Sequence, residues 1–159
     1  MSGILWGPTL RVNFLAFTRI PLLFAARPAV MQLDETRCVL RIKLRRGTKN
    51  HLGSMYFGAL CIGADCAGGL IAWNEIERSG KKIALIFKDF SAEFLKRPDR
   101  DMYFVSSEGA KMRELVRRAA EGLDRVEDLV TIDAVSDPAD VAGTKFATFQ
   151  LTISLKQRE

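Results

Sequence analysis

The sequence predicts an α+β fold in which a long antiparallel β-sheet wraps around one central helix, over about residues 54–74. That stretch is almost wholly apolar and is as long as a core helix. Residues 37–45 and 145–156 alternate apolar and polar side chains, which predicts strands with one buried face. No repeat, linker or low-complexity segment interrupts the chain, so we expect a single domain over 1–159.

The part of the chain before the central helix predicts a short helix and a hairpin. An amphipathic helix is expected over about 8–20, ending at Pro21 because proline cannot continue a helix. Residues 29–33 and 37–45 flank a polar turn and are expected to pair as a β-hairpin. A basic loop, 46–49, follows; its charges are either simply solvated or contact a phosphate near a binding site.

The part after the central helix predicts four strands and one helix. A strand beginning at Lys82 is expected to continue past Pro98, turn near Asp99 and return as 102–106. Residues 109–121 gather their apolar side chains on one face, which predicts a surface amphipathic helix. Residues 125–135 and 145–156 are the last two strand candidates. The resulting sheet would have one polar outer face.

Composition narrows the possible partners. Lys and Arg number 24 against 19 Asp and Glu, a mildly basic balance of +5 that looks spread along the chain. This is too weak to predict nucleic-acid binding, but it is compatible with a phosphorylated small ligand. The central apolar run is long enough to span a membrane. Its internal Asp65, its glycines and the strands that follow favour a core helix instead, so we expect no membrane partner.

The three cysteines form neither a disulfide framework nor a CxxC metal motif. Reduced cysteines are typical of the cytoplasm, which is the location that we expect. We also expect no metal site and no bound cofactor.

Asp65 is the strongest candidate functional residue because it is the one charge within the apolar run. A carboxylate in such a setting is expensive unless hydrogen bonds satisfy it. It is therefore either a buried structural aspartate held by backbone donors or a working carboxylate at the floor of a cleft. At helical spacing Asp65 shares one face of the helix with Gly58, Cys61, Ile62, Gly68, Gly69 and Ala72. A lone subunit would leave this small, apolar face exposed, so we expect a homodimer or a dimer of dimers.

Two sets of motifs carry a family resemblance. The stretch NHLGSMYFGAL, with the later AD and GG, resembles the Asn, Gly-Gly and Asp pattern of the small PaaI-type acyl-CoA thioesterases. The segments RPAVMQLDE, FKDFSAEFLKRP and FATFQLTISLK resemble DUF4442, an uncharacterised hot-dog family. The resemblance covers about residues 20–156. It implies a hot-dog fold and an acyl-CoA thioesterase whose only coenzyme is the coenzyme A of its substrate.

The resemblance also implies roles for single residues. Asn50 matches the asparagine that positions the thioester or the attacking water. Asp65 matches the helix carboxylate that acts as base or nucleophile. Phe57 and Gly58 match the glycine pair at the helix start, where a backbone amide polarises the thioester oxygen.

His51 and Tyr56 complete the expected substrate-binding set. The thioesterases read His-Gly-Gly where this chain reads Tyr56-Phe57-Gly58. An amide survives that change, but we expect the Phe57 ring either to narrow the pocket or to block it.

Three functions remain open. An acyl-CoA thioesterase needs a base and oxyanion donors, and the proposed donors lie roughly 10 Å before Asp65 along one helix. The resemblance therefore implies that Asp65 of one subunit meets Asn50 and Phe57 of the partner subunit. The Phe57 departure instead favours a non-catalytic module that binds acyl groups or CoA. A hot-dog dehydratase would pair His51 with Asp65, but the proline-glycine signature of dehydratases is absent.

Overall fold

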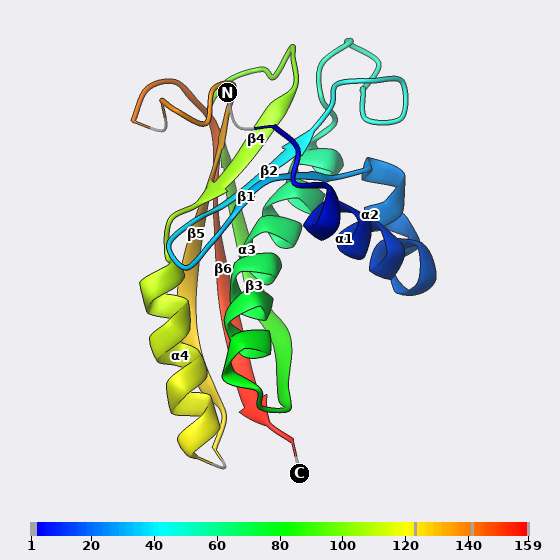
Figure 1. Ribbon diagram of the computed structural model, residues 1–159. Helices are drawn as coiled ribbons and strands as arrows, with labels where there is room; N and C mark the ends of the chain where they lie inside the picture. The colour runs from blue at the N-terminus through cyan, green and yellow to red at the C-terminus, as the bar shows by residue number, and fades with distance from the viewer. Residues whose placement is uncertain (1–2, 123, 141, 159) are drawn as a thin grey trace.

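The computed structural model describes residues 3–122, 124–140 and 142–158. A six-stranded antiparallel sheet curves around α3 (Phe57–Ser79), which lies along its concave face (Figure 1). This is the hot-dog arrangement that the sequence predicted. The strands run in the order β1-β2-β4-β5-β6-β3. Their bounds are β1 Ala29–Leu33, β2 Cys38–Ile42, β3 Ile83–Phe94, β4 Met102–Ser106, β5 Val126–Val135 and β6 Lys145–Gln157.

Close approach between α3 and the sheet depends on two glycines. A β-carbon at Gly63 would lie 2.3 Å from the ring of Phe104 on β4, and one at Gly68 would lie 3.2 Å from Ile132 on β5. Both facing side chains are fully buried. A larger residue on this face of α3 would push the helix away from the strands, so glycine is retained despite its low helix propensity.

The central helix starts and ends later than the predicted 54–74. Ser54 is no helix cap: its hydroxyl bonds to Asn50 Oδ1, and Met55 N donates to the Pro98 carbonyl, which keeps this segment extended. The N-cap is Tyr56. At the other end, the helix continues to Ser79 because Gly80 is the first residue to adopt a left-handed conformation, with φ of 65°.

The predicted hairpin between 82–98 and 102–106 is wrong. β3 pairs with β6 at one edge of the sheet, whereas β4 lies between β2 and β5. The segment after β3 crosses the N-terminal end of α3, where the Pro98 carbonyl accepts a hydrogen bond from Met55 N. Local turn signals near Asp99 could not reveal this, because strand partners are chosen by contacts that are distant in sequence.

A bulge in β3 controls which side chains face α3. The register shifts between Phe87 and Asp89, so Lys88 has no partner on β6. Phe87 pairs with Ile153 and Phe90 with Leu151, both of which are buried residues of β6. Without the extra residue, Phe90 would point to the outer face of the sheet.

Two short helices at the N-terminus pack beside α3 (Figure 1). α1 (Trp6–Arg19) matches the predicted helix over 8–20 closely. α2 (Pro21–Ala26) was not predicted, because a proline after an amphipathic segment indicates the end of one helix and not the start of another. It occupies the first position of α2, where its missing N–H is harmless.

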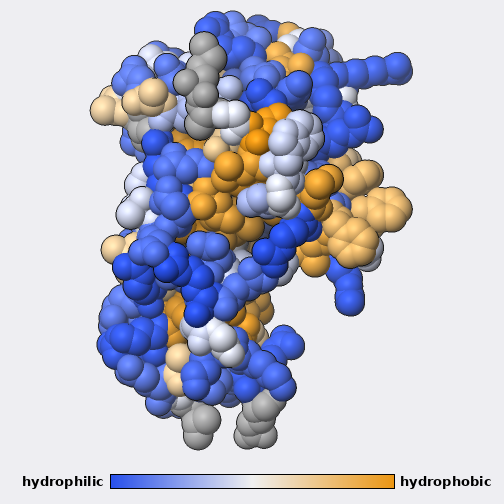
Figure 2. Space-filling model, viewed as in Figure 1, coloured by the Kyte–Doolittle hydropathy of each residue, from blue (hydrophilic) through white to orange (hydrophobic). Residues whose placement is uncertain are grey.

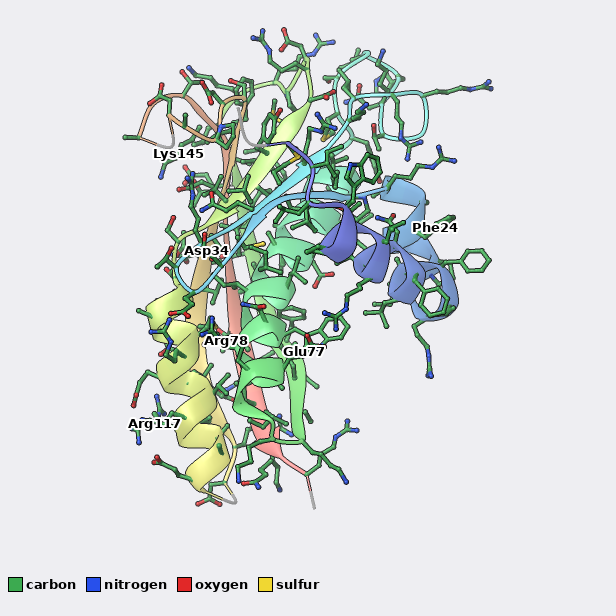
Figure 3. All side chains as sticks on the ribbon, viewed as in Figure 1. Phe24, Asp34, Glu77, Arg78, Arg117 and Lys145 are labelled. Atoms are coloured by element: carbon green, nitrogen blue, oxygen red, sulfur yellow. The ribbon has the colours of Figure 1, made fainter. Side chains whose placement is uncertain are left out.

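The remaining helix and the hairpin confirm the predictions. α4 (Gly109–Glu121) has the predicted bounds and buries its apolar face beside α3 and against the sheet. The ion pairs of Glu35 with Arg78 and Arg113 tie the β1–β2 turn to α3 and α4; Arg78 is labelled in Figure 3. β1 and β2 form the expected hairpin. The outer face of the sheet is less polar than predicted, because Met31, Val39, Val105 and Val135 form a small cluster there.

α3 is long and apolar enough to cross a membrane, but 56% of its most apolar window is buried inside the fold. A buried core helix passes the same test of length and composition, so α3 is weak evidence for a membrane span.

We expect Gly63→Ala to destabilise the fold and Gly69→Ala to leave it unchanged or slightly more stable. Overpacking against Phe104 costs about 1–3 kcal/mol, which exceeds the gain in helix propensity of about 1 kcal/mol. A β-carbon at Gly69 would lie 3.3 Å from Phe87, whose ring is 36% exposed on an edge strand and has room to shift. Equal melting temperatures for the two variants would contradict the close-packing argument.

Candidate functional site

One face of α3 is only partly covered by the rest of the chain. We call it the open stripe: Gly58, Cys61, Ile62, Asp65 and Gly69, all half-buried. The predicted face is thus correct except for Gly68 and Ala72, which are fully buried toward the sheet. The open stripe is small and mostly apolar, so it offers close contact to a second surface.

Asp65 lines an apolar pocket of about 180 Å³ between α3, β3 and the two N-terminal helices. Val12, Leu15 and Phe87 are among the surrounding side chains, and Asp65 is the only acidic one. Within the described part of the chain, no donor bonds to its carboxylate. Burial raises the pKa of Asp65 above its usual 3.8. The structure therefore gives no support to an aspartate held by backbone donors.

The N-terminus of α3 presents two backbone amides without acceptors. Tyr56 N donates to the Thr48 carbonyl at 2.8 Å, and Ala59 N donates to the Tyr56 carbonyl at 2.9 Å. Between them, the amides of Phe57 and Gly58 find no acceptor among the described residues. Adjacent free amides at a helix N-terminus form a donor pair with a favourable dipole, which suits a developing oxyanion.

Asn50 organises the loop that leads into this helix. Its Oδ1 accepts hydrogen bonds from Leu52 N at 2.9 Å and from both Ser54 N and Ser54 Oγ at 3.2 Å. This acceptor is therefore occupied by the loop. The Nδ2 group of Asn50 has no protein acceptor in the described segments, so it is the part of the side chain available to a ligand.

Four of the predicted site residues line one pocket of about 630 Å³ at the start of α3: Asn50, His51, Tyr56 and Phe57. The far wall comes from Phe94 at the end of β3 and from the segment that follows, including Arg97, and sequence reasoning missed both residues. Arg97 donates to the Leu52 carbonyl and so joins this wall to the loop. No sequence signal could have found it, because the pairing of β3 at the sheet edge was not predicted.

Aromatic rings narrow this pocket. The rings of Tyr56 and Phe57 lie 4.6 Å apart between centroids, and Phe57 meets Phe94 at 6.3 Å. A β-carbon at Gly58 would lie 2.5 Å from Cε1 of Tyr56, so that ring rests directly on the glycine. Phe57 remains 57% exposed and does not seal the pocket.

Within one subunit, the fold does not bring Asp65 to the other predicted residues. Eight residues separate Phe57 from Asp65, which is about 12 Å along α3, and the two residues line different pockets. Gly58 lies on the open stripe between them. His51 is exposed in the loop and makes no contact with Asp65.

More apolar surface surrounds the open stripe. β3 is an edge strand with exposed phenylalanines, and Figure 2 shows apolar side chains gathered over α1 and α2. Among the described residues, no group of three or more His, Cys, Asp or Glu side chains is placed to hold a metal ion.

The chain belongs to the family described as a domain of unknown function, DUF4442, which matches residues 10–153. Among curated proteins, none is detectably similar in sequence.

Solved structures show the same fold. PA5026 of Pseudomonas aeruginosa, a protein of unknown function described as a probable thioesterase, has a TM-score of 0.76 at 21% identity and covers 95% of this chain and 97% of its own. OLEI01261 of Chlorobaculum tepidum, of unknown function, reaches 0.83 at 7% identity and 99% coverage of both. The thioesterase HI1161 of Haemophilus influenzae gives 0.65 at 11% identity, with 94% and 90% coverage. The chain therefore has the hot-dog fold of thioesterase-like proteins.

We expect Asp65→Asn to be more stable than the wild type at pH 7. Because burial raises the pKa of Asp65, the stability that this group contributes is complete below pH 3.8 and is lost as pH rises through the raised value. Asparagine has no such loss. The difference in unfolding free energy, measured by urea titration at several pH values, should shrink as pH falls toward about 3.

Asp34→Asn serves as the control with the opposite sign. Hydrogen bonds from Gln32 and Thr36 lower the pKa of Asp34, so its contribution is present at neutral pH and is lost in acid. This variant should be less stable than the wild type at pH 7. If Asp65→Asn behaves in the same way, Asp65 is a structural anchor.

Proposed function

We propose that the protein is a thioester hydrolase of the acyl-CoA type whose site forms between two subunits. The observation that carries the proposal is the arrangement along one partly exposed face of α3: a free amide pair at its start, and a desolvated, unbonded carboxylate two turns later. Thioester hydrolysis requires oxyanion donors and a base for water, and these two groups supply that chemistry.

Symmetry offers a way to close the gap of about 12 Å between these groups. Residue 61 lies midway between Phe57 and Asp65. If a twofold axis passes near Cys61, two antiparallel α3 helices place Asp65 of each subunit beside Phe57 of the partner subunit, and both sites are completed together. The small residues of the open stripe allow this approach, and the unpaired edge of β3 is free to join a second sheet.

In this site, the ionised Asp65 removes a proton from water. The hydroxide attacks the thioester carbon, and the amides of Phe57 and Gly58 stabilise the resulting oxyanion. Asn50 Nδ2 orients the thioester or the water. Collapse of the intermediate expels the thiolate, which recovers the proton. Only the coenzyme A of the substrate takes part; the scheme uses no metal or bound cofactor. The three free cysteines favour a cytoplasmic protein.

Binding without turnover is the second candidate, and the aromatic cover at Tyr56 and Phe57 favours it. A panel of acyl-CoA esters with free-thiol detection separates the two. Turnover supports the hydrolase, whereas tight binding with no thiol release identifies a binding module. A dehydratase would instead change the absorbance of a 3-hydroxyacyl thioester, with His51 acting beside Asp65 of the partner subunit.

We expect Asp65→Asn to lower thioester hydrolysis by about 10²- to 10⁴-fold, the usual loss when a general base is removed. The rate of the wild type should fall in acid through a pKa above 3.8, because burial raises the pKa of Asp65 and only the carboxylate is active. Unfolding measured on the same samples checks that the variant is folded. Full activity in Asp65→Asn would refute the role of the carboxylate.

Asn50→Asp tests the loop amide without collapsing the loop. The acceptor oxygen bonded by Leu52 and Ser54 is kept, while the Nδ2 donor is lost. We expect a rate about 10- to 100-fold lower, the effect of losing one hydrogen bond to a charged group, with an unchanged melting temperature. An unchanged rate would mean that Nδ2 does not touch the substrate.

Cys61 tests the register of the dimer. It is the only half-exposed thiol, since Cys38 and Cys66 are buried. We expect a short bis-maleimide to link two chains at mildly alkaline pH, because burial raises the pKa of Cys61 and the thiolate is the reactive form. The product would have twice the 17.8 kDa of one chain, and Cys61→Ser should not be linked. Light scattering that finds only 17.8 kDa at micromolar concentration would end the dimer proposal.

A further inference from the structure

A second groove lies on another side of the molecule, between α1, the end of α2 and strands β1 and β2. Its volume is about 420 Å³. Four cations line it and no acidic residue does: Arg27, Arg41, Lys43 and Arg45. We call it the N-terminal groove. Its lining contrasts with the apolar pocket at Asp65 and points to an anionic ligand.

These cations lack carboxylate partners in the described part of the chain, where eleven other ion pairs form. Arg45 donates to the carbonyl of Ala25, which fixes its guanidinium at the groove. The Nε atom of Arg41 is buried and has no acceptor. A buried donor without a partner is costly, and an acceptor on a bound ligand would relieve it.

Arg27 adds an independent observation. It caps the C-terminus of α2 with φ of 51°, and it is the only non-glycine residue with positive φ in the described segments. Glycine is the usual residue in this conformation, because a β-carbon is disfavoured there. Arg27 in this conformation is less stable than glycine would be, and its side chain lines the groove. Strained residues of this kind cluster at ligand sites.

Two aromatic side chains line the same groove. Trp6 is 67% exposed and Phe24, labelled in Figure 3, is 36% exposed. An exposed indole beside guanidinium groups suits a flat heterocycle that carries phosphate, because the ring stacks while arginine pairs with the phosphate oxygens.

The distribution of charge along the chain agrees with this. Residues 1–64 contain nine cations and two acids, whereas residues 65–159 contain 15 cations and 17 acids. The positive charge is therefore concentrated in the first part of the chain, rather than spread as the sequence analysis assumed. This part forms the walls of the groove.

The loop after β2 connects the groove to the start of α3. Thr48 Oγ1 donates to the Lys43 carbonyl at 2.7 Å, and the Thr48 carbonyl accepts from Tyr56 N at 2.8 Å. Lys43 lines the groove, and Tyr56 lines the pocket with the free amides. A ligand with a long flexible arm could thus place its charged end in one and its reactive end in the other.

We propose that the N-terminal groove binds a phosphorylated adenosine, the nucleotide end of a coenzyme A thioester. The choice of coenzyme A rests on the proposed function, while binding of the nucleotide does not. Arg27, Arg41 and Lys43 pair with the phosphates, and the adenine stacks on Trp6.

The test uses adenosine 3′,5′-bisphosphate, which carries no thioester, so binding is measured whether or not the protein hydrolyses anything. In a Trp73→Phe background, Trp6 is the only tryptophan. We expect the bisphosphate to quench its fluorescence saturably, with calorimetry on the wild type giving the same affinity and adenosine binding at least tenfold more weakly. Affinity should fall as salt rises, because the phosphate contacts are screened.

Arg27→Gly and Arg41→Gln should each weaken binding about tenfold or more, the loss of one charge-assisted hydrogen bond. Arg118→Gln, which removes an exposed cation on α4, is the matched control and should bind as the wild type does. Arg27→Gly also has a second readout. Its melting temperature should equal or exceed that of the wild type, because glycine adopts φ of 51° without strain.

Three results would overturn the proposal: no saturable binding of the bisphosphate by the wild type, unchanged affinity in both groove variants, or quenching of Trp6 by vesicles with one anionic lipid in five but not by the bisphosphate. The last result would assign this surface to a membrane. If the protein binds the bisphosphate but hydrolyses no thioester, the proposed hydrolase is refuted and the proposal of nucleotide binding in the N-terminal groove stands.

Discussion

The close approach of α3 to the sheet is the constraint on which the rest of the structure depends. Gly63 against Phe104 and Gly68 against Ile132 let the strands lie directly on the backbone of the helix. The sheet can then curve around α3 with no gap in the core. The sheet, α4 and α2 cover the other faces of α3, and the half-buried open stripe is the face that they leave partly exposed.

The chemistry of the open stripe follows from what is missing around it. Asp65 is half-buried and accepts no hydrogen bond from the described residues, so burial makes its charge unfavourable and raises its pKa. The amides of Phe57 and Gly58 are hydrogen-bond donors that find no acceptor among the described residues. A straight helix holds these groups about 12 Å apart and cannot bend to join them. A single chain therefore keeps these groups apart, and the site that we propose is complete only where a second subunit brings them together.

The sequence was sufficient for the parts of the fold that local patterns determine. The apolar run, the alternation in β6 and the amphipathic 109–121 each reflect burial of one face, so their existence and type were predicted correctly. The errors arose where distant contacts decide. The Pro98 carbonyl delays the start of α3, and the pairing of β3 with β6 cannot be inferred from the turn near Asp99. For the candidate site, motif resemblance predicted Asn50, Phe57 and Asp65, but it could not show that Oδ1 of Asn50 already accepts hydrogen bonds from Leu52 and Ser54.

Arg27 adopts a backbone conformation that is unfavourable for folding, and we infer that its side chain serves ligand binding instead. A glycine at the end of α2 would relieve the left-handed conformation, so folding alone does not explain an arginine there. Its neighbours in space, Arg41, Lys43 and Arg45, repel it, which adds a second unfavourable contribution to folding. An anion in the groove would replace this repulsion by attraction, and its pairing with Arg27 would offset the backbone strain. The loop that begins at Lys43 and Arg45 of the groove also positions Asn50 and the free amides of Phe57 and Gly58. An anion bound in the groove would therefore hold this loop against the start of α3. The cationic groove at one end of the loop is thus connected to the amides of Phe57 and Gly58 at the other end through Thr48, a buried side chain that no sequence motif singles out.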